Sequence, residues 1–143
     1  RGNWWKYKHE PMTLDAVLLY AQAGTGKRAN LFTDYTFALW NLRGEVSEER
    51  ELVTFAKAYS GLNHNQIAEL DRWIRTHTLE RYGPTRVVEP KQVFEIAFEG
   101  VMESKRHKCG LAVRFPRIKR WRIDKVASDA DCIEEAQALI DIH

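Results

Sequence analysis

The sequence predicts a mainly β domain, a five-stranded barrel with one helix between strands 3 and 4 and a second helix at the C-terminal end. Segments rich in β-branched and aromatic residues alternate with turn residues along most of the chain. One long amphipathic segment interrupts them in the middle. The 143 residues are 44% hydrophobic, which suffices for one domain with a real core.

Three apolar segments with many β-forming side chains occupy the first part of the chain. We expect strands over residues 13–23, 30–42 and 52–59. The first two flank the turn Gly24–Lys27 and should form a long hairpin. This turn contains a Gly-Lys pair, but Ala21 and Arg28 stand where a phosphate-binding Walker motif requires Gly and Ser or Thr. We therefore expect an ordinary hairpin tip that carries cations.

The clearest helix is predicted over residues 63–79. Asn63 can cap its first turn, and Gln66 lies three residues later, as in a capping box. An apolar stripe at helical spacing follows, formed by Ile67, Leu70, Trp73 and Ile74. A Gly-Pro turn at 83–84 ends this unit.

The last part of the chain predicts further strands and a closing helix. Strands are expected over residues 85–88, 92–98 and 111–115, with a basic turn over 105–110. The closing helix is expected over 128–142, with Ser128 as its cap and Asp131 as its first-turn acid. Three strands, a helix and then more strands is the order of an OB barrel, which binds nucleic acid through cations and stacking aromatics. A β-sandwich fits less well, because the helix is long and central.

A basic and aromatic run over residues 114–125 carries the strongest functional signal. Residues 105–125 contain nine of the 22 Lys and Arg residues and one of the 20 acids, Asp124, so this segment has a net charge of +8 and the rest of the chain −6. The run also contains Phe115 and Trp121. Cations interleaved with large aromatics suit phosphate and nucleic acid rather than a core, so we expect a polyanionic partner.

Other functional classes are disfavoured. No apolar run approaches the ~20 residues of a membrane span, and the N-terminus lacks a signal-peptide pattern. Cys109 and Cys132 are expected as free thiols, and no His or Cys spacing predicts a metal site. No pattern of nucleophile, base or paired carboxylates supports independent catalysis, so any activity should use residues supplied by a missing part.

Three motifs resemble segments of one enzyme family. The run Asn3–Lys8 places an aromatic before Lys-x-Lys at the abrupt start of the chain, which indicates a fragment. Thr13–Val17 leads to Gly24–Ala29 in the first hairpin, and Arg114–Arg117 is followed by Arg122–Lys125. In this order and spacing they resemble motif V, the start of the OB domain and motif VI of the ATP-dependent DNA ligases. The likeness is closest to the bacterial ligases linked to crosslink and cisplatin-type damage repair.

The resemblance implies a division of the chain and a nucleotide site. Residues 1–10 would end the nucleotidyltransferase domain and form a hinge, and residues 11–143 would be the OB domain. Lys6 and Lys8 would contact the nucleotide phosphate. The residues that would close over ATP and orient the departing pyrophosphate are Arg122, Asp124 and Lys125. The family's nucleophilic lysine and metal-binding carboxylates lie upstream, so this fragment alone should be inactive; ATP and Mg²⁺ would bind the full enzyme and not the fragment alone.

The resemblance also implies nicked duplex DNA as a substrate, sealed through a lysyl-adenylate and a DNA-adenylate. Arg114 and Phe115 resemble the family's minor-groove pair beside the nick, where an apolar wedge with a cation distorts duplex DNA. From the residue alone, Phe115 fits the barrel core equally well. The other implied DNA contacts are Lys27, Arg28, Lys105, Arg106, Lys108 and Arg117. The implied partners are DNA, ATP and the upstream nucleotidyltransferase domain, in a cytoplasmic, nucleoid-associated bacterial monomer with no membrane contact.

Two alternatives stay open, and one segment departs from the family pattern. An RNA ligase or an mRNA capping enzyme shares motifs V and VI, although Arg114–Arg117 and the first hairpin favour a DNA ligase. A non-enzymatic single-strand-binding module would use Trp and Phe side chains as stacking platforms. Many family members carry Lys-x-Gly-Thr-Gly-Phe after the third strand, where this chain has Ala-Lys-Ala-Tyr-Ser-Gly-Leu at 56–62.

Overall fold

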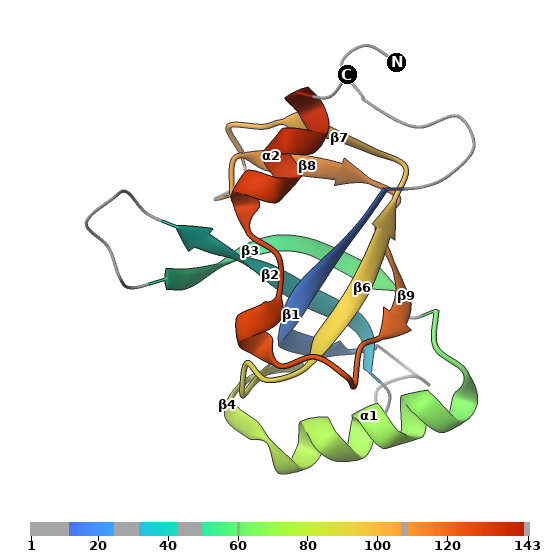
Figure 1. The fold of residues 1–143 in the computed structure, drawn as a ribbon. Helices are drawn as coiled ribbons and strands as arrows, with labels where there is room; N and C mark the ends of the chain where they lie inside the picture. The colour runs from blue at the N-terminus through green and yellow to red at the C-terminus, as the bar shows by residue number, and fades with distance from the viewer. Residues whose placement is uncertain (1–11, 25–31, 43–49, 60, 107–108, 142–143) are drawn as a thin grey trace.

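The computed structural model describes residues 12–24, 32–42, 50–59, 61–106 and 109–141, which are mostly β (Figure 1). The strands are β1 (Met12–Ala23), β2 (Phe32–Leu42), β3 (Arg50–Tyr59), β4 (Thr78–Tyr82), β5 (Thr85–Val88), β6 (Val93–Phe98), β7 (Gly100–Glu103), β8 (Leu111–Arg114) and β9 (Arg117–Trp121). The helical elements are α1 (His64–Thr76), the 3₁₀ turn η2 (Ala127–Asp129) and α2 (Ile133–Asp141).

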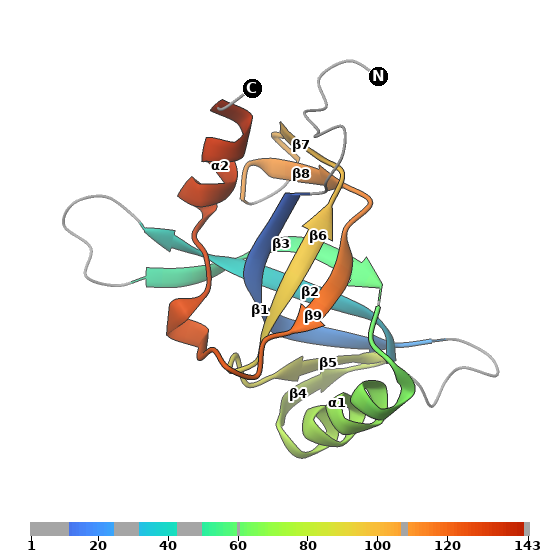
Figure 2. The same ribbon diagram turned by 45° about the vertical axis from the view of Figure 1, so that its right-hand side comes forward.

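Five of these strands form a ring. β1 pairs with β2, β2 with β3, β3 with β9, β9 with β6, and β6 with β1. All these pairs are antiparallel except β3–β9, which is parallel and aligns Tyr59 with Arg117. α1 follows β3 in the chain, and β6 is the fourth ring strand in sequence order. The predicted five-stranded OB-type barrel, with a helix between its third and fourth strands, is therefore confirmed (Figure 1, Figure 2).

Two hairpins are added to the ring. β4 and β5 extend the sheet outward from β1, and β7 and β8 form a separate sheet beside α2 (Figure 2). β4, β7 and β9 lie outside the strands that the sequence pattern predicts. The expectation that the central helix runs to Leu79 is wrong, because Thr78 already pairs with Val88 in the β4–β5 hairpin. The Thr78 hydroxyl donates to the Ile74 carbonyl at 2.6 Å, which ends the helix before β4.

Aromatic rings from several strands meet in the barrel core. Phe37 of β2 packs edge-on against Phe94 of β6, with ring centroids 5.4 Å apart. Trp121 of β9 stacks on Phe94 at 5.4 Å, and its indole N–H donates to the Gln92 side chain at 2.9 Å. The expectation that both aromatics of the basic run face a ligand is therefore wrong for Trp121, because this large ring is buried and its polar atom already has a partner.

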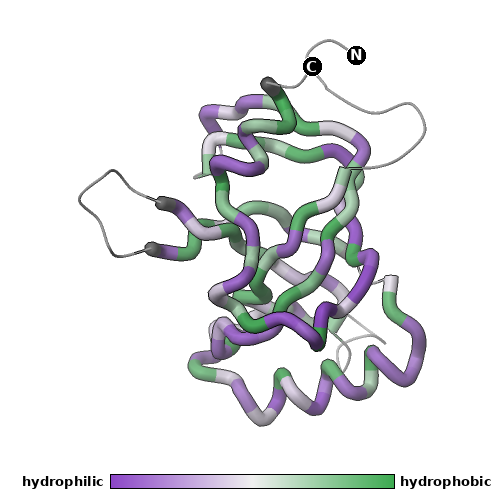
Figure 3. The backbone as a smooth tube through the Cα atoms, in the orientation of Figure 1, coloured by the Kyte–Doolittle hydropathy of each residue, from purple (hydrophilic) through white to green (hydrophobic). Residues whose placement is uncertain are grey.

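α1 lies across the lower end of the barrel in the view of Figure 1. The Gln66 N–H donates to the Asn63 side chain at 2.9 Å, and the Asn63 N–H donates to the Gln66 side chain at 3.2 Å. The predicted capping box is confirmed. Leu70 and Ile74 of the predicted stripe are fully buried, and Trp73 packs against the core. The cap and the stripe together fix the helix against the barrel, and Figure 3 shows hydrophobic and hydrophilic residues alternating along α1.

The C-terminal helix begins later than predicted. α2 starts at Ile133, and Ser128 lies in η2 rather than at a helix cap. The Asp131 N–H donates to the Asp15 carbonyl at 2.9 Å, and the Asp131 carbonyl accepts from the Trp40 N–H at 3.1 Å. The Asp131 carbonyl thereby bonds to β2 and not to an N–H of a following helical turn, and α2 starts only at Ile133, so Asp131 is not a first-turn acid.

Gly61 lies where the chain leaves β3 and passes β9. A Cβ atom at this position would lie 2.3 Å from the carbonyl oxygen of Ile118, so the close approach requires glycine. Ala56 and Ala58 in the preceding strand are buried. The segment that departs from the family pattern therefore packs against the strand that closes the barrel.

We predict that Asn63→Ala lowers the free energy of unfolding by about 1 kcal/mol, because it removes the side-chain acceptor of the capping box. Asn65→Ala is the matched control, since Asn65 is an exposed residue of the same helical turn. Its substitution should change the free energy of unfolding by less than about 0.5 kcal/mol. Chemical denaturation followed by circular dichroism measures both variants, and equal losses would contradict the capping role.

Candidate functional site

The basic run 114–125 is split by β9, so that its charged residues lie near both ends of this strand. The strand has 5 residues, which at ~3.3 Å per residue make it about 16 Å long. One end carries the turn from β8, which we call the Phe115 turn and which comprises residues 114–117. The other end leads into the group that we call the Arg122 cluster. Its members are Asp15, Arg122, Asp124 and Lys125. A run that is continuous in sequence thus forms two separate clusters.

Phe115 projects from the tip of the Phe115 turn. Its side chain is 64% exposed, so the core position that the sequence left open is excluded. Its φ of 54° is the one positive value among the non-glycine residues of the described ranges. This left-handed conformation costs roughly 1–2 kcal/mol, and Pro116 further restricts the residue before it. An exposed aromatic in a strained backbone conformation is typical of a functional position.

Nearby ionic groups hold the Phe115 turn. The Arg114 guanidinium lies over the Phe115 ring, 5.1 Å from its centroid. Arg117 donates to the Phe115 carbonyl at 3.1 Å and pairs with Glu99 at 2.7 Å. The Glu99 N–H in turn donates to the Arg114 carbonyl at 2.8 Å. The turn therefore presents an exposed apolar ring with a cation stacked on it, an arrangement that can contact an apolar surface and an anion side by side.

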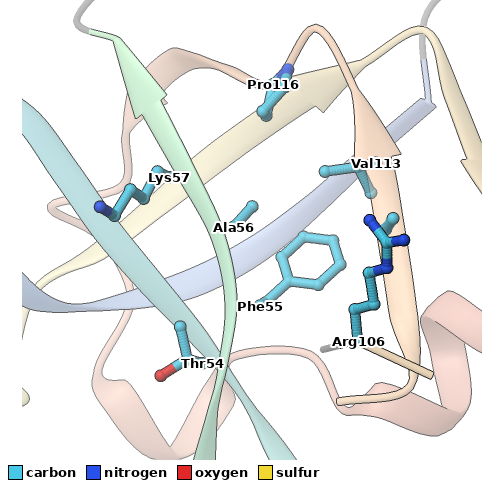
Figure 4. Close-up of a pocket in the computed structure, with 8 residues that line it drawn as sticks. Thr54, Phe55, Ala56, Lys57, Arg106, Val113 and Pro116 are labelled. Atoms are coloured by element: carbon cyan, nitrogen blue, oxygen red, sulfur yellow. The ribbon is translucent and has the colours of Figure 1, made fainter. Parts of the chain in front are cut away.

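An open groove of about 600 Å³ lies beside the Phe115 turn, between β3 and β8 (Figure 4). Its lining residues are Thr54, Phe55, Ala56, Lys57, Arg106, Ala112, Val113 and Pro116. Figure 4 shows Lys57 and Arg106 on opposite sides of the groove, with Phe55 between them. Arg106 is one of the predicted phosphate contacts, whereas Lys57 is not, because it belongs to the segment that departs from the family pattern.

The Arg122 cluster is built around a buried carboxylate of β1. Asp15 is 7% exposed, accepts from the Lys125 ammonium at 2.5 Å and lies 3.5 Å from the Arg122 guanidinium. Arg122 also donates twice to Asp124, at 3.0 and 2.9 Å. The Asp124 side chain is 67% exposed, whereas that of Arg122 is 18% exposed. The guanidinium therefore bridges a buried and an exposed carboxylate.

Backbone bonds and a third carboxylate support the cluster. The Arg122 N–H donates to the Val93 carbonyl at 2.9 Å, and the Lys125 N–H donates to the Arg122 carbonyl at 3.2 Å. The Asp15 N–H donates to an Asp131 carboxylate oxygen at 2.7 Å. The turn after β9 is therefore fixed to β1 and to the start of β6, and β1 is in turn bonded to the segment before α2.

Pairing and burial shift the pKa values in this cluster. Hydrogen bonds from Arg122 lower the pKa of Asp124 to about 2, and the same bonds raise the pKa of Arg122. The hydrogen bond to Asp15 raises the pKa of Lys125. Burial raises the pKa of Asp131 to about 6, and the neighbouring carboxylates of Glu135 and Asp15 act in the same direction. Both cations are consequently charged at neutral pH.

Some of the predicted site residues lie in the described part of the chain, and these fall into separate groups. Three predicted residues meet in the Arg122 cluster and three in the Phe115 turn, while Lys105 and Arg106 are exposed between β7 and β8. The predicted residues outside the described ranges are Lys6, Lys8, Lys27, Arg28 and Lys108. The sequence analysis missed Asp15 and Asp131 as members of a site. The available signal was one charged residue inside the apolar segment 13–23.

The remaining chemistry of the described residues is limited. Within the described ranges, no group of three or more His, Cys, Asp or Glu side chains is placed to hold a metal ion. The helices described are too short or too polar to cross a bilayer. Cys109 is buried, and this burial raises the pKa of its thiol; Cys132 is half-buried, and neither cysteine forms a disulfide.

The fold and the two clusters define an OB-type barrel domain with a wedge-shaped turn at one end of its closing strand and an ion-paired Arg-x-Asp-Lys turn at the other. The family described as ATP dependent DNA ligase C terminal region matches residues 28–125. The chain belongs to this family.

Several relatives match nearly the whole chain. It is 47% identical over 137 residues to a probable DNA ligase of Koribacter versatilis, with 96% of this chain and 23% of that protein covered. It is 43% identical over 136 residues to a probable DNA ligase of Opitutus terrae, with 95% and 13% covered. It therefore spans no more than about a quarter of the length of these curated relatives.

A solved structure supports the fold. The ligase domain of M. tuberculosis LigD superposes with a TM-score of 0.62 at 16% sequence identity. The match covers 83% of this chain and 38% of that chain. At this identity the likeness concerns the fold, and it agrees with the barrel derived from the strand pairing.

We predict that Asp131→Asn raises the free energy of unfolding at about pH 7 and has little effect near pH 4. The folded-state pKa of Asp131 is raised from 3.8 to about 6, so folding disfavours the charged form. This cost is complete above about pH 6 and absent below about pH 4. Asn keeps an oxygen that can accept from the Asp15 N–H. The gain should be about 1 kcal/mol, because the half-buried side chain is partly screened.

Denaturant unfolding across this pH range tests the prediction. The difference in unfolding free energy between the Asp131→Asn variant and the wild type should grow as the pH rises from about 4 to about 7. A difference that stays constant with pH would show that the substitution acts through packing, and the titration argument would be wrong.

Proposed function

We propose that this chain is the OB domain of an ATP-dependent DNA ligase, which binds nicked duplex DNA through the Phe115 turn and ATP through the Arg122 cluster. The observation that carries the proposal is the placement of these clusters at opposite ends of β9. Because one strand holds both, a rotation of the whole domain can present either cluster to a partner without refolding. Membership of the ligase C-terminal family supports both roles.

The Phe115 turn supplies the DNA contact in this proposal. The exposed ring enters the minor groove beside the nick as an apolar wedge, and Arg114 stays close to the flanking phosphates. Lys57, Arg106 and Lys105 add backbone contacts that carry no sequence information. An interrupted strand lowers the cost of bending the duplex, so the wedge should favour nicked over intact DNA.

The Arg122 cluster supplies the contact to ATP. A lysine from another part of the enzyme attacks the α-phosphorus, a P–N bond forms, and the P–O bond to pyrophosphate breaks. Arg122 and Lys125 would stabilise the charge that collects on the departing pyrophosphate. Asp15 orients the Lys125 ammonium through a hydrogen bond, and Asp124 orients the Arg122 guanidinium through two. Each cation must share or exchange its carboxylate partner when it binds a phosphate.

The Mg²⁺ that accompanies ATP in this family does not fit the described residues, which provide no group of carboxylates for an ion. The role proposed for this chain therefore rests on its arginine and lysine side chains. The AMP would pass to the 5′-phosphate of the nick, and the 3′-hydroxyl would displace it to seal the strand.

The buried Trp121 counts against a single-strand-binding module. Such a module uses exposed aromatic rings as stacking platforms, and Trp121 lies in the core. Phe115 alone then remains exposed among the aromatics of the basic run. A single wedge suits a duplex groove better than a row of stacked bases.

We predict that the chain binds nicked duplex DNA with an affinity that falls steeply with salt, because most contacts are to phosphates. Phe115→Ala should weaken this binding about tenfold, or about 1.4 kcal/mol, and leave the salt dependence unchanged, because no charge is lost. Fluorescence anisotropy with a labelled nicked duplex, an intact duplex and a single strand measures all three affinities.

Ile123→Ala is the matched control for this experiment. Ile123 is 75% exposed, slightly more than Phe115, and lies beyond the other end of β9. Its substitution should leave DNA affinity unchanged. Equal effects of the two substitutions, salt-insensitive binding, or a preference for the single strand would each contradict the proposed function.

We further predict that Arg122→Ala or Lys125→Ala in the complete ligase slows formation of the lysyl-adenylate about 100-fold and slows sealing of pre-adenylated nicked DNA much less. The reason is that the cluster acts on the departing pyrophosphate. Arg120→Ala is the control, since Arg120 is an exposed cation of β9 paired with Glu95 at 3.4 Å. Single-turnover assays with radiolabelled ATP separate the steps. Equal loss in both steps would contradict a role confined to ATP.

A further inference from the structure

Three arginines that neither site uses converge on a second cavity. It has a volume of about 270 Å³. It lies between the last turn of α1, the β4–β5 hairpin, the C-terminal end of β1 and the N-terminal end of β2. We call it the three-arginine pocket. Its lining residues are Ala23, Gly24, Phe32, Arg75, Arg81, Gly83, Pro84 and Arg86. Each arginine comes from a different element, so the sequence analysis had no local motif that could predict it.

The guanidinium groups gather around one aromatic ring. Arg75 lies over the Phe32 ring at 5.1 Å and Arg86 at 5.7 Å from its centroid. Arg86 also donates to the Thr78 hydroxyl at 3.3 Å. Arg81 is exposed and is the cross-strand partner of Arg86. Two cations are therefore stacked on the Phe32 ring, and Arg81 lines the same cavity from the strand next to Arg86.

The hairpin that aligns Arg81 with Arg86 is tightly constrained. Tyr82 pairs with Thr85 across a two-residue turn, in which Gly83 has a φ of +59°. A first turn residue with positive φ strongly favours glycine. The Ala23 N–H donates to the Pro84 carbonyl at 2.9 Å, and this bond joins the hairpin to β1. The arginines are consequently presented by a fixed framework.

Two of the three arginines in this pocket, Arg81 and Arg86, form no ion pair within the described residues. Asp71 pairs with Arg75 at 2.9 Å, while like charges stand directly opposite each other at Arg81 and Arg86. Directly opposed like charges destabilise a hairpin. Burial, together with the charges of Arg81 and Arg75, lowers the pKa of Arg86. A bound anion would relieve this repulsion.

We propose that the three-arginine pocket binds a phosphate group of the DNA backbone. Guanidinium forks match phosphate oxygens in pairs, and several forks converging from different directions fit one tetrahedral anion better than a planar carboxylate. The DNA assignment rests on the function proposed above. It adds a binding site, away from the Phe115 turn, that reaches a different part of the duplex.

The sheet register gives the separation of the two sites. Asp34 of β2 pairs with Tyr59 of β3, which pairs with Arg117 of β9. Phe32 precedes Asp34 by two residues, and Phe115 precedes Arg117 by two residues. Because β2 and β9 run in opposite directions here, the two offsets add. With ~4.8 Å between strands and ~3.3 Å per residue, the two Cα atoms are no more than about 16 Å apart, because the curvature of the barrel and the turn at Phe115 shorten the flat-sheet distance. This distance corresponds to about five nucleotides along one strand of a duplex, so one bound DNA can reach both sites.

The salt dependence of DNA binding tests the proposal. The 143-residue chain, Arg81→Ala and Arg86→Ala are titrated into labelled nicked duplex at several NaCl concentrations. Each lost phosphate contact should reduce the slope of log affinity against log salt by about 0.9 and weaken binding several-fold at low salt. Thermal melting shows whether each variant is folded. If Arg86→Ala does not fold, Arg81→Ala still tests the pocket, because Arg81 is exposed and its removal should not disturb the fold.

Arg72→Ala is the matched control. Arg72 is an exposed arginine of α1 that does not line the pocket, and its removal should leave the slope at the wild-type value. Wild-type slopes for Arg81→Ala and Arg86→Ala, with normal duplex binding by the wild type, would overturn the pocket alone. No duplex binding by the wild type would overturn both the proposed function and the DNA assignment.

A second arm distinguishes DNA from a free anion. Arginine Nε–Hε resonances are followed by NMR while either nicked duplex or inorganic pyrophosphate is added. We expect the resonances of Arg75, Arg81 and Arg86 to shift with DNA. Shifts with pyrophosphate, combined with unchanged salt slopes in the variants, would assign the pocket to a free phosphate compound and overturn the DNA proposal.

Discussion

The barrel is closed by β9, and both proposed sites depend on this closure. β9 is antiparallel to β6 over most of its length, but it meets β3 through the parallel alignment of Tyr59 and Arg117. Gly61 lies against the Ile118 carbonyl at the same junction. Ile118 and Trp121 point into the core, whereas Lys119 is exposed. The same strand therefore completes the core on one side and fixes the spacing of the charged turns at its two ends.

The two sets of cations differ in their electrostatic balance. In the Arg122 cluster, two cations meet the carboxylates of Asp15 and Asp124, so the cost of removing these charges from water is offset within the protein. In the three-arginine pocket, Arg75 pairs with Asp71, while Arg81 and Arg86 form no ion pair within the described residues. A phosphate that binds the Arg122 cluster must compete with the carboxylates of Asp15 and Asp124. A phosphate that binds the three-arginine pocket would supply the negative charge that Arg81 and Arg86 lack. Reversible contact with a nucleotide suits the first arrangement, and a stable backbone contact suits the second.

Local patterns in the sequence were sufficient for the long hairpin, the capping box of α1 and the strands that alternate clearly. They were insufficient where tertiary pairing decides the structure. β4 takes residues with helical periodicity because Thr78 pairs with Val88, and α2 starts late because Asp131 bonds to β1 and β2. The same limit applies to the site. Arg122 and Lys125 were evident from a contiguous motif, whereas the carboxylate that holds Lys125 lies 110 residues away in β1.

The length of β9 also bears on the order of events in the proposed reaction. The Phe115 turn and the Arg122 cluster are separated by a strand of about 16 Å, and both are fixed to it by backbone and ionic contacts. Reacting atoms in an active site must come within about 3.5 Å of each other. The cluster that contacts the departing pyrophosphate and the wedge that contacts the duplex are therefore too far apart for both to touch the same reacting phosphorus in one domain orientation. In the proposed reaction, a turn of the domain between the ATP step and the DNA step would bring each into contact in its own step, and the internal carboxylates of the Arg122 cluster would hold its cations while the DNA face is engaged.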